Sequence, residues 1–480
     1  MPNELKSRVL SGVKWTATAR AGAQMITWVI SILVIRYLQP DDYGLKAMAE
    51  VFFSMLLLMS TAGIGSAIIQ AKAVTDDQLR RVFGFLLLIN LSLALAQWFA
   101  ADLIADWYRE PRVADVVKVL ALGFLIVPFK VIPHALLGKA MEFKKRSLSD
   151  LAGAVISSLI MFYLAVAGYG VWALVAGQLI GLLIPTIAYQ IVCPYLKLPW
   201  FTLRHMGGML RFGGILLLTD ILYLLFSRID TIIGGRELGA DLIGIYAVAM
   251  LLASLPRAKI MPLLNQVAFP AYATIQDDMA EIRRYFLKSV AMTSLVTFPF
   301  FFGLAAVAEP AILSILGESW RPAIFPVVLL SLSMPLRSLL TMFAPVVNAI
   351  NRPTVETWNV GFQLVAMTLA FIVGVRWGID GLVYAWVTVF PLVFIVSGTL
   401  FLRALEIGIR DFLRSLMPAT LLALMMFGAV AGVDHTLFSG WPQLLRLSAD
   451  IGVGVIVYGV ALRGVFPQQL TALIALFRRA

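Results

Sequence analysis

The sequence predicts an all-α polytopic membrane protein with about 14 transmembrane helices in two similar halves. The first observation is composition: 60% of the 480 residues are hydrophobic and 14% are charged, whereas soluble domains carry about 25% charged residues. The second is a series of apolar stretches of about 20 residues each, the length that crosses a bilayer. The third is a segment that occurs twice at a fixed offset along the chain.

The apolar stretches follow one another along the chain with short loops between them. Each has the length and hydrophobicity of a membrane-spanning helix. The predicted helices cover roughly 14–36, 43–69, 82–104, 113–137, 148–167, 170–192, 211–233, 242–265, 287–316, 323–347, 356–375, 380–402, 413–432 and 446–464. The longest linkers are predicted at about 194–210, 266–286 and 433–445, so almost no chain remains for a soluble domain.

Lysine and arginine are distributed unequally between alternate loops. If the N-terminus is cytoplasmic, the cytoplasmic segments hold 23 of these residues and the opposite segments hold 7. Positive charge concentrates on the cytoplasmic side of membrane proteins. The bias therefore predicts an even number of crossings with both termini in the cytoplasm.

The repeated segment reads RYLQPDDYGLKAMA at 36–49 and RELGADLIGIYAVA at 236–249. Six residues recur at an offset of 200, namely Arg36, Leu38, Asp41, Gly44, Ala47 and Ala49, as Arg236, Leu238, Asp241, Gly244, Ala247 and Ala249. Membrane proteins built from two similar halves are typically transporters with a site at the interface of the repeats. We therefore predict an N-terminal six-helix lobe at 1–195, a second at 205–405, and peripheral helices 13 and 14 at 406–480.

Several basic residues lie within or close to the apolar runs. A charge at the bilayer centre costs about 2.5–3.5 kcal/mol on insertion scales, so such residues usually face a cavity or a partner. The expected cations of a central cleft are Arg20, Lys46, Arg228, Arg257, Lys259 and Arg337. Because bases outnumber acids in these spans, the cleft is expected to suit an anionic ligand.

Three acids in the same spans leave an alternative open. Lys46 and Glu50 have the i, i+4 spacing of a helical ion pair, and Asp220 and Asp230 flank Arg228. These acids either neutralise the bases as structural pairs or couple transport to an ion.

The sequence contains no pattern that indicates catalysis or a cofactor. The three histidines, His134, His205 and His435, lie far apart, and the single cysteine is Cys193. HExxH, GxSxG and P-loop motifs are absent from the sequence. We therefore expect neither an enzyme nor a metal or other cofactor. The +11 formal charge is spread between apolar runs, which is atypical of nucleic-acid binding.

Five segments together resemble the polysaccharide transporter family of the multidrug, oligosaccharidyl-lipid and polysaccharide exporter superfamily, and most closely its colanic-acid-exporter-like flippases. They are LQPDDYGLKAMA (38–49), VPFKVIPHALLGKAMEFKKRS (127–147), GYGVWALVAGQ (168–178), SRIDTIIGGRELGADLIGIYAVAMLLASLP (227–256) and FPAYATIQDD (269–278). The resemblance covers roughly residues 5–400. It implies two six-helix lobes around a central cleft, plus two peripheral helices.

The resemblance also implies a function: translocation of an undecaprenyl-diphosphate-linked oligosaccharide to the periplasmic leaflet of the bacterial inner membrane. Basic residues in the cleft of related flippases hold the diphosphate, and Arg20, Lys46 and Arg228 match that role by residue type and helix. Implied partners are membrane lipids and a polysaccharide polymerase and co-polymerase, with no nucleic acid. Two alternatives remain, a multidrug or organic-cation extruder of the same superfamily and a non-transporting scaffold of a polysaccharide assembly complex.

Overall fold

The structure of the chain is a computed structural model, and it describes residue 22 and residues 27–61, 63–71, 74–201, 207–438 and 440–467. Every regular element in these ranges is helical. The contacts divide the chain into two compact units, Met1–Gly244 and Ile245–Ala480. The predicted boundaries at 195, 205 and 405 stay a prediction.

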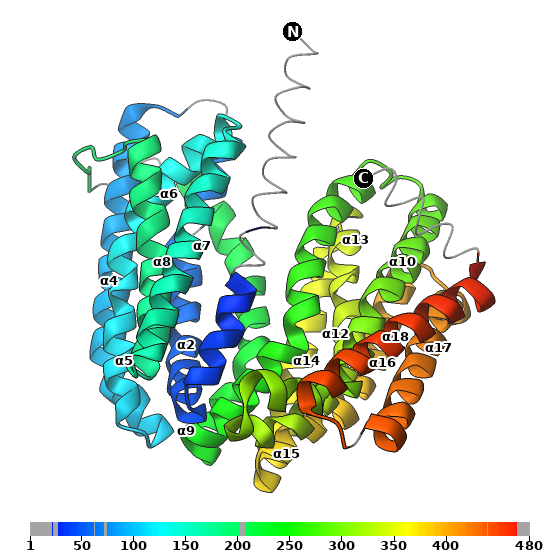
Figure 1. The fold of residues 1–480 in the computed structure, drawn as a ribbon. Coiled ribbons are helices and arrows are strands. Elements are labelled where there is room, and N and C mark those ends of the chain that lie inside the picture. Colours follow the sequence, from blue (N-terminus) through cyan, green and yellow to red (C-terminus); the bar gives the residue numbers. More distant parts are fainter. Residues whose placement is uncertain are drawn as a thin grey trace. The chain divides into compact units, whose positions relative to one another are not determined.

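The first unit begins, within the described residues, with an apolar helix over Thr27–Tyr37. The helices that follow, drawn from blue to green in Figure 1, are α2 (Pro40–Thr61), α3 (Ile64–Gln70), α4 (Asp76–Tyr108), α5 (Arg112–Ala121), α6 (Gly123–Lys139), α7 (Phe143–Val166) and α8 (Val171–Val192). Its apolar cores include one cluster of α3, α4 and α6 side chains, among them Ile68, Leu86 and Ile132. Another joins Val34 to Ala173 and Leu174 of α8.

Helix α9 (Gly207–Ala273) is 67 residues long and is interrupted at Gly239, whose φ of 79° and ψ of 178° are not helical. Only glycine adopts this conformation readily. The part of α9 up to Gly244 belongs to the first unit and the remainder to the second. The break falls between the predicted helices 211–233 and 242–265, in the second copy of the repeat.

The second unit continues with short and long helices in alternation. They are α10 (Met279–Ala306), α11 (Ala308–Ala311), η1 (Ile312–Leu316), η2 (Glu318–Ala323), α12 (Ile324–Thr341), α13 (Phe343–Ala349), α14 (Pro353–Gly374), η3 (Val375–Trp377), α15 (Gly378–Tyr384), η4 (Ala385–Val389), α16 (Phe390–Ala404), α17 (Ile409–Val433), η5 (Asp434–Phe438) and α18 (Gln443–Val465). The π-helical turns η1, η4 and η5 interrupt otherwise α-helical runs. Stacked Phe343 and Phe401, with ring centroids 4.8 Å apart, join α13 to α16.

Eleven helical segments of the described chain are long and apolar enough to cross a membrane. Two of them, Asp220–Pro262 and Pro353–Ala404, have 43 and 52 residues, which as helix exceeds about 60 Å against a hydrocarbon core of about 30 Å. Large apolar side chains point outward from the eleven segments. One example is Phe99 of α4, whose side chain is 78% exposed. The chain is therefore a multi-pass membrane protein.

Helix ends differ from the predicted ones where a polar cap extends the helix. The predicted helix 82–104 starts six residues earlier, at Asp76, because Thr75 and Gln78 form a reciprocal capping box. The expected linker 266–286 is largely helical, with a break between Ala273 and Met279. Helix α9 runs to Ala273, and α10 starts at Met279 because the Asp278 side chain accepts a hydrogen bond from the backbone N–H of Glu281 at 2.9 Å.

Candidate functional site: a cationic pair on α2 and α9

Lys46 and Arg228 bring two positive charges together in the first unit. Lys46 lies on α2, whose start carries Pro40 in the first turn and two acids, Asp41 and Asp42, where the helix dipole favours negative charge. Arg228 lies on the first part of α9, and its charge is close enough to that of Lys46 to repel it. Two of the predicted cleft cations are therefore neighbours.

Lys46 also has a partner on its own helix. Its ammonium group forms an ion pair with Glu50 one turn later, and only 17% and 21% of the two side chains are exposed. The predicted i, i+4 pair is thus present in the structure. Because Glu50 offsets the charge of Lys46, the group formed by Lys46, Glu50 and Arg228 keeps a net charge of one positive unit.

Arg228 is half-buried, and no ion pair joins it to any acid in the described part of the chain, Asp220 and Asp230 included. Asp220 is exposed. Asp230 is 2% exposed, and its Oδ1 accepts hydrogen bonds from the N–H of Thr231 at 2.7 Å and from its hydroxyl at 3.3 Å. A half-buried guanidinium with no carboxylate is suited to binding an anion through charge-assisted hydrogen bonds.

The two copies of the repeated segment hold α2 against α9. An ideal Cβ on Gly44 would lie 1.8 Å from the carbonyl oxygen of Ala240, and one on Gly244 would lie 1.7 Å from that of Pro40. The two contacts correspond to each other, because positions 40 and 44 are equivalent to positions 240 and 244 at the repeat offset of 200. The absence of side chains at both glycines allows the backbones to touch next to Lys46.

Aromatic residues at the end of α4 fix the neighbouring turn of α9. The Arg236 guanidinium lies 3.9 Å from the centre of the Trp107 ring. An ideal Cβ on Gly235 would approach Tyr108 to 2.7 Å and Met48 to 3.2 Å. Arg236 falls between the predicted helices 211–233 and 242–265, and its stacking on Trp107 is a contact across the fold that the sequence does not show.

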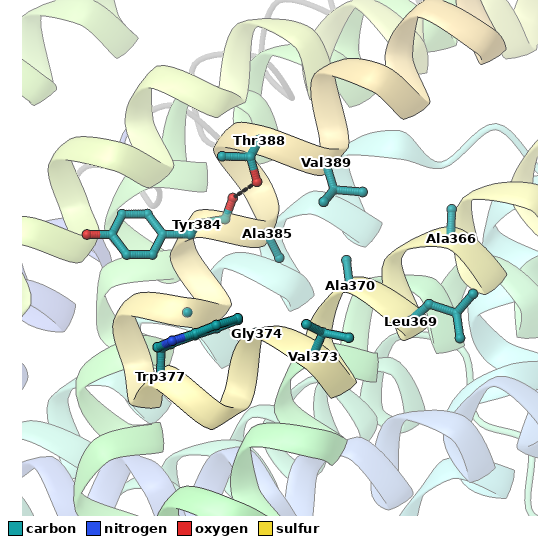
Figure 2. Close-up of a pocket in the computed structure, with 11 residues that line it drawn as sticks. Ala366, Leu369, Ala370, Val373, Gly374, Trp377, Tyr384, Ala385, Thr388 and Val389 are labelled. Atoms are coloured by element: carbon teal, nitrogen blue, oxygen red, sulfur yellow. Dashed lines mark hydrogen bonds between the residues drawn. The ribbon is translucent and has the colours of Figure 1, made fainter.

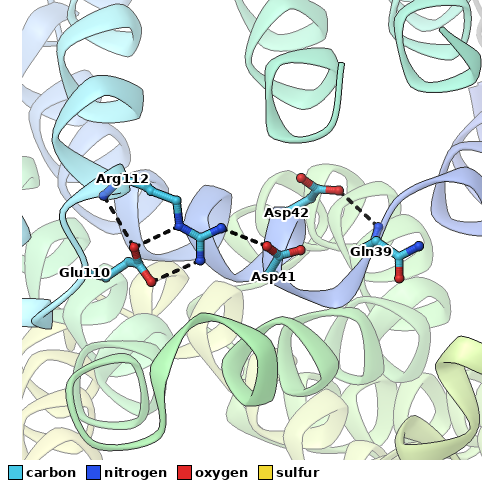
Figure 3. Close-up of polar contacts among 5 residues, drawn as sticks. All are labelled: Gln39, Asp41, Asp42, Glu110 and Arg112. Carbon is cyan, nitrogen blue, oxygen red and sulfur yellow. Dashed lines mark hydrogen bonds and ion pairs between the residues drawn. The ribbon is translucent and has the colours of Figure 1, made fainter. Parts of the chain in front are cut away.

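Arg112 ties the start of α2 to α5 (Figure 3). Its Nε and Nη2 donate to the Glu110 carboxylate at 2.9 and 3.1 Å, and its Nη1 donates to Asp41 at 2.9 Å. The neighbouring Asp42 accepts from the backbone N–H of Gln39 at 3.0 Å. The repeated Asp41 thus positions the helix that carries Lys46.

The other predicted cations are placed differently. Arg20 lies outside the described residues. Arg257 and Lys259 lie half-buried on the second part of α9, in the second unit. Arg337 on α12 is also in the second unit and is only 7% exposed.

Arg337 is enclosed by aromatic and sulfur groups of its own unit. Its guanidinium lies 3.9 Å from the centre of the Trp386 ring, and its Nη1 donates to the Met250 sulfur at 3.2 Å. Trp386, on the π-helical turn η4, donates its indole N–H to the Tyr246 hydroxyl at 2.7 Å. These contacts hold Arg337 against Trp386 and Met250, and the sequence did not reveal them because Trp386 is 49 positions away.

A second polar cluster joins α6, α7 and α8 in the first unit. Arg146 contacts the Nε2 of His134 at 2.7 Å, and the Tyr189 hydroxyl donates to Asp150 at 2.9 Å. Lys130 lies over the Tyr189 ring at 5.8 Å. His134 therefore has an arginine neighbour, and the α6 residues Lys130 and His134 both face α7 and α8.

A cavity of about 650 Å³ lies between α14 and the α15–η4 segment (Figure 2). Alanine, valine, leucine and glycine form most of its lining, together with Trp377, Tyr384 and Thr388. The Thr388 hydroxyl is occupied by the backbone carbonyl of Tyr384 at 2.7 Å. With no charged side chain in its lining, this cavity suits an apolar chain and not an anionic headgroup.

Among the residues with described positions, no group of three or more His, Cys, Asp or Glu side chains has the arrangement of a metal site. Lys46 and Arg228 offer positive charge and N–H donors, which suit ionic binding. A group of two bases and one acid, with one net positive charge, can attract and hold an anion.

Three curated relatives cover much of the chain. It is 28% identical over 329 residues to the lipopolysaccharide biosynthesis protein WzxC of Escherichia coli strain K12, covering 67% of this chain and 66% of that protein. It is 27% identical to the teichuronic acid biosynthesis protein TuaB of Bacillus subtilis strain 168, over 99% of both chains. It is 25% identical to the succinoglycan biosynthesis transport protein ExoT of Rhizobium meliloti strain 1021, over 94% of this chain and 92% of that protein.

Two solved structures share the fold. The lipid II flippase MurJ in an inward closed conformation superimposes with a TM-score of 0.73 at 16% identity, covering 93% of this chain and 98% of that one. An inward-facing multidrug resistance transporter of the MATE family superimposes with a TM-score of 0.59 at 16% identity, covering 80% and 95%. The chain thus shares the fold of these two membrane proteins. Residues 33–325 match the family described as polysaccharide biosynthesis protein, and the chain belongs to that family.

Proposed function

We propose that the protein is a flippase that moves an undecaprenyl-diphosphate-linked oligosaccharide from the cytoplasmic to the periplasmic leaflet of the bacterial inner membrane. The family and the names of WzxC, TuaB and ExoT support a role in polysaccharide assembly. The observation that supports an anionic substrate is the environment of Arg228. It is a half-buried cation beside Lys46, and no described carboxylate neutralises it.

A diphosphate fits this arrangement chemically. Lys46 and Arg228 contribute several N–H donors, and charge-assisted hydrogen bonds to phosphate oxygens are about twice as strong as neutral ones. Glu50 orients the Lys46 ammonium through their ion pair. Arg20, Arg257 and Lys259 are proposed as further contacts of the same substrate, whereas Arg337 is proposed as a structural residue.

The proposed topology has 14 crossings with both termini in the cytoplasm. Asp220–Pro262, with its break at Gly239, and Pro353–Ala404, with its turn at Gly378, are each long enough for two crossings. The predicted helix 14–36, of which Thr27–Tyr37 covers the described part, brings the proposed total to 14. The proposed lobes are 1–195 and 205–405, and 406–480 forms the peripheral pair. Reporter fusions at residues 40 and 480 test this topology, and we expect signals from opposite sides of the membrane.

Deletion of the gene tests the flippase directly. We expect lipid-linked sugar repeats to accumulate in the cytoplasmic leaflet, identified by mass analysis of extracted lipid. A scaffold that organises the polymerase and co-polymerase without transporting predicts no such accumulation, and this result would overturn the proposal.

A multidrug or organic-cation extruder is the second candidate, because the MATE transporter shares the fold. The two candidates predict opposite effects on binding to the purified protein. For a diphosphate lipid, Arg228→Ala weakens binding and Glu50→Gln strengthens it, since the net charge of the site changes by one unit in opposite directions. For an organic cation, both effects are reversed.

A further inference from the structure

Asp450 is a fully buried acid in the peripheral helix α18. It is 0% exposed, and neither of its carboxylate oxygens has a donor among the described residues. The carboxyl group of Asp434 is within hydrogen-bonding reach, but as a carboxylate it can only accept. Helix α18 packs mainly against α17 and α11. A buried carboxylate with no donor is strongly disfavoured, because it loses its hydration without a replacement. Ionisable residues at such depth in membrane proteins usually have a function.

The groups next to Asp450 are mostly acids. Arg446, one turn earlier on α18, forms a two-point ion pair with Asp434 of η5, including an Nη2 to Oδ2 contact of 2.6 Å. It also donates to Glu309 of α11 at 2.9 Å. Asp434 and Arg446 both act electrostatically on Asp450. Three carboxyl groups therefore surround one guanidinium, which is already shared between two of them.

No other described base is placed to neutralise Asp450. From η2, Arg321 interacts with Glu309 and is paired with Glu318. Of the other packed segments, η1 has no titratable side chain, those of α17 lie in its first two turns, and those of α10 lie within its first ten residues. His435, beside Asp434, is exposed. The hydroxyl of Tyr458, farther along α18, is occupied by the carbonyl oxygen of Leu295 on α10 at 2.7 Å.

We propose that Asp450, with Asp434, Arg446 and Glu309, forms a proton-binding site in which Asp450 carries the proton. A bound proton removes the repulsion between Asp450 and Asp434 and the cost of burying an unsatisfied carboxylate. A metal ion fits less well, because hard cations require about six oxygen ligands and both oxygens of Asp434 already contact Arg446.

Proton loss would redistribute the bonds of Arg446. Arg446 and Asp450 are four residues apart on α18, the spacing of an intrahelical ion pair. Ionised Asp450 therefore competes with Glu309 and Asp434 for the guanidinium. While Asp450 is neutral, Arg446 connects α18 to α11 and η5; after proton release to water, the pair within α18 forms and the contact with α11 weakens.

Infrared spectroscopy of the purified full-length protein tests the bound proton. At pH 7 we expect a carbonyl-stretch band of a neutral carboxylic acid, and we expect Asp450→Asn to remove one such band. Asp102→Asn, which changes an exposed acid paired with Lys118, is the matched control and leaves the band unchanged. An unaltered band in Asp450→Asn would overturn the proposal.

Thermal unfolding against pH separates proton binding from a purely structural need for a carboxylate. Asparagine mimics neutral aspartic acid, so Asp450→Asn should match the wild-type midpoint at low pH and exceed it at high pH, where the wild type must bury a charge. A variant that is equally destabilised at every pH would contradict the proposal. A wild-type midpoint that depends on Na⁺ at constant ionic strength, and not on pH, would show a cation site instead.

Discussion

An ideal Cβ atom on Gly244 would lie 2.9 Å from the backbone nitrogen of Gly44. Equivalent positions of the two repeat copies therefore meet backbone to backbone. Gly44 faces Ala240, and Gly244 faces Pro40. A methyl group at either position overlaps main-chain atoms, which cannot move aside as a flexible side chain can. This crossing sets the distance between α2 and the part of α9 around Ala240 and Gly244.

We expect Gly44→Ala and Gly244→Ala each to destabilise the protein by about 1–3 kcal/mol, the usual cost of forcing extra atoms into a packed region. Denaturant unfolding of the purified protein measures this free energy. The double variant should cost less than the sum, because a single separation of the backbones relieves both overlaps. Gly361→Ala on α14 is the control, since nothing lies within 4 Å of its ideal Cβ. Gly44→Ala as stable as this control would contradict the close crossing.

The repeated glycines were visible in the sequence, but their role was not. Hydropathy and charge bias predicted the helical membrane class, because both depend on composition averaged over about 20 residues. The repeat offset identified Gly44 and Gly244 as equivalent. Their contact with each other depends on how α2 and α9 cross, and local sequence patterns carry no information about that crossing.

The candidate site was predictable to the extent that its interactions are local. The Lys46–Glu50 pair follows from i, i+4 spacing within one helix. The proximity of Lys46 to Arg228, the Arg337–Trp386 stack and the Arg446–Glu309 bond join residues 49 to 182 positions apart, so only the folded chain reveals them. For Asp450, the sequence pattern that could have indicated a site is an acid four residues after Arg446 within an apolar run.

We expect Arg228→Ala to reduce transport at least tenfold without lowering the amount of folded protein, because Arg228 forms no ion pair with a described acid. Arg228→Lys should retain part of the activity, since lysine keeps the charge and loses the planar fork of donors. Complementation of a deletion strain, with protein quantified in isolated membranes, measures both quantities. Arg463→Ala, an exposed arginine at the end of α18, is the matched control. Normal transport by Arg228→Ala would remove Arg228 from the site.

Arg337 should behave in the opposite way. We expect Arg337→Ala to lower thermal stability, because Trp386 and Met250 lose the group packed against them. Trp386→Phe should cost about 1–3 kcal/mol, since it leaves the buried Tyr246 hydroxyl without the donor it contacts at 2.7 Å. Combining it with Tyr246→Phe should recover part of that loss in a double-mutant cycle of unfolding free energies. A loss of substrate binding by Arg337→Ala at unchanged stability would identify Arg337 as a substrate contact instead.

The Arg112 network predicts a dependence of stability on acid. The Arg112 guanidinium, through its hydrogen bonds to the Glu110 carboxylate, holds the pKa of Glu110 below its ordinary value. Because the folded-state pKa is the lower one, this stabilisation is present above the ordinary glutamate pKa and is lost as pH falls through the folded-state pKa. Arg112 is 55% exposed, so the effect is at most about 1 kcal/mol. The free energies of unfolding of the wild type and of Glu110→Gln should differ at pH 7 and become equal in acid. A difference that is the same at every pH would contradict the ion pair.

The membrane potential is expected to drive transport of the proposed diphosphate substrate. With the cytoplasm negative, outward movement of two negative charges gains about 4.6 kcal/mol at about 100 mV, and about 1.4 kcal/mol corresponds to a tenfold ratio. An uncompensated headgroup would therefore be distributed outward by about three orders of magnitude, without a dedicated ion site. Movement of the group formed by Lys46, Glu50 and Arg228 with the headgroup would carry one net positive charge and halve this gain.

Proteoliposomes with an imposed potential and no pH or sodium gradient test this expectation. Reversing the potential should change the initial rate and the final distribution, and a lipid with a single phosphate should respond about half as strongly per 100 mV because the energy scales with charge. Equal rates and endpoints at both polarities would refute potential-driven transport. A strict requirement for a proton or sodium gradient would instead make Glu50, Asp220 or Asp230 the coupling residue, and Asp450→Asn would then show whether the peripheral proton site contributes.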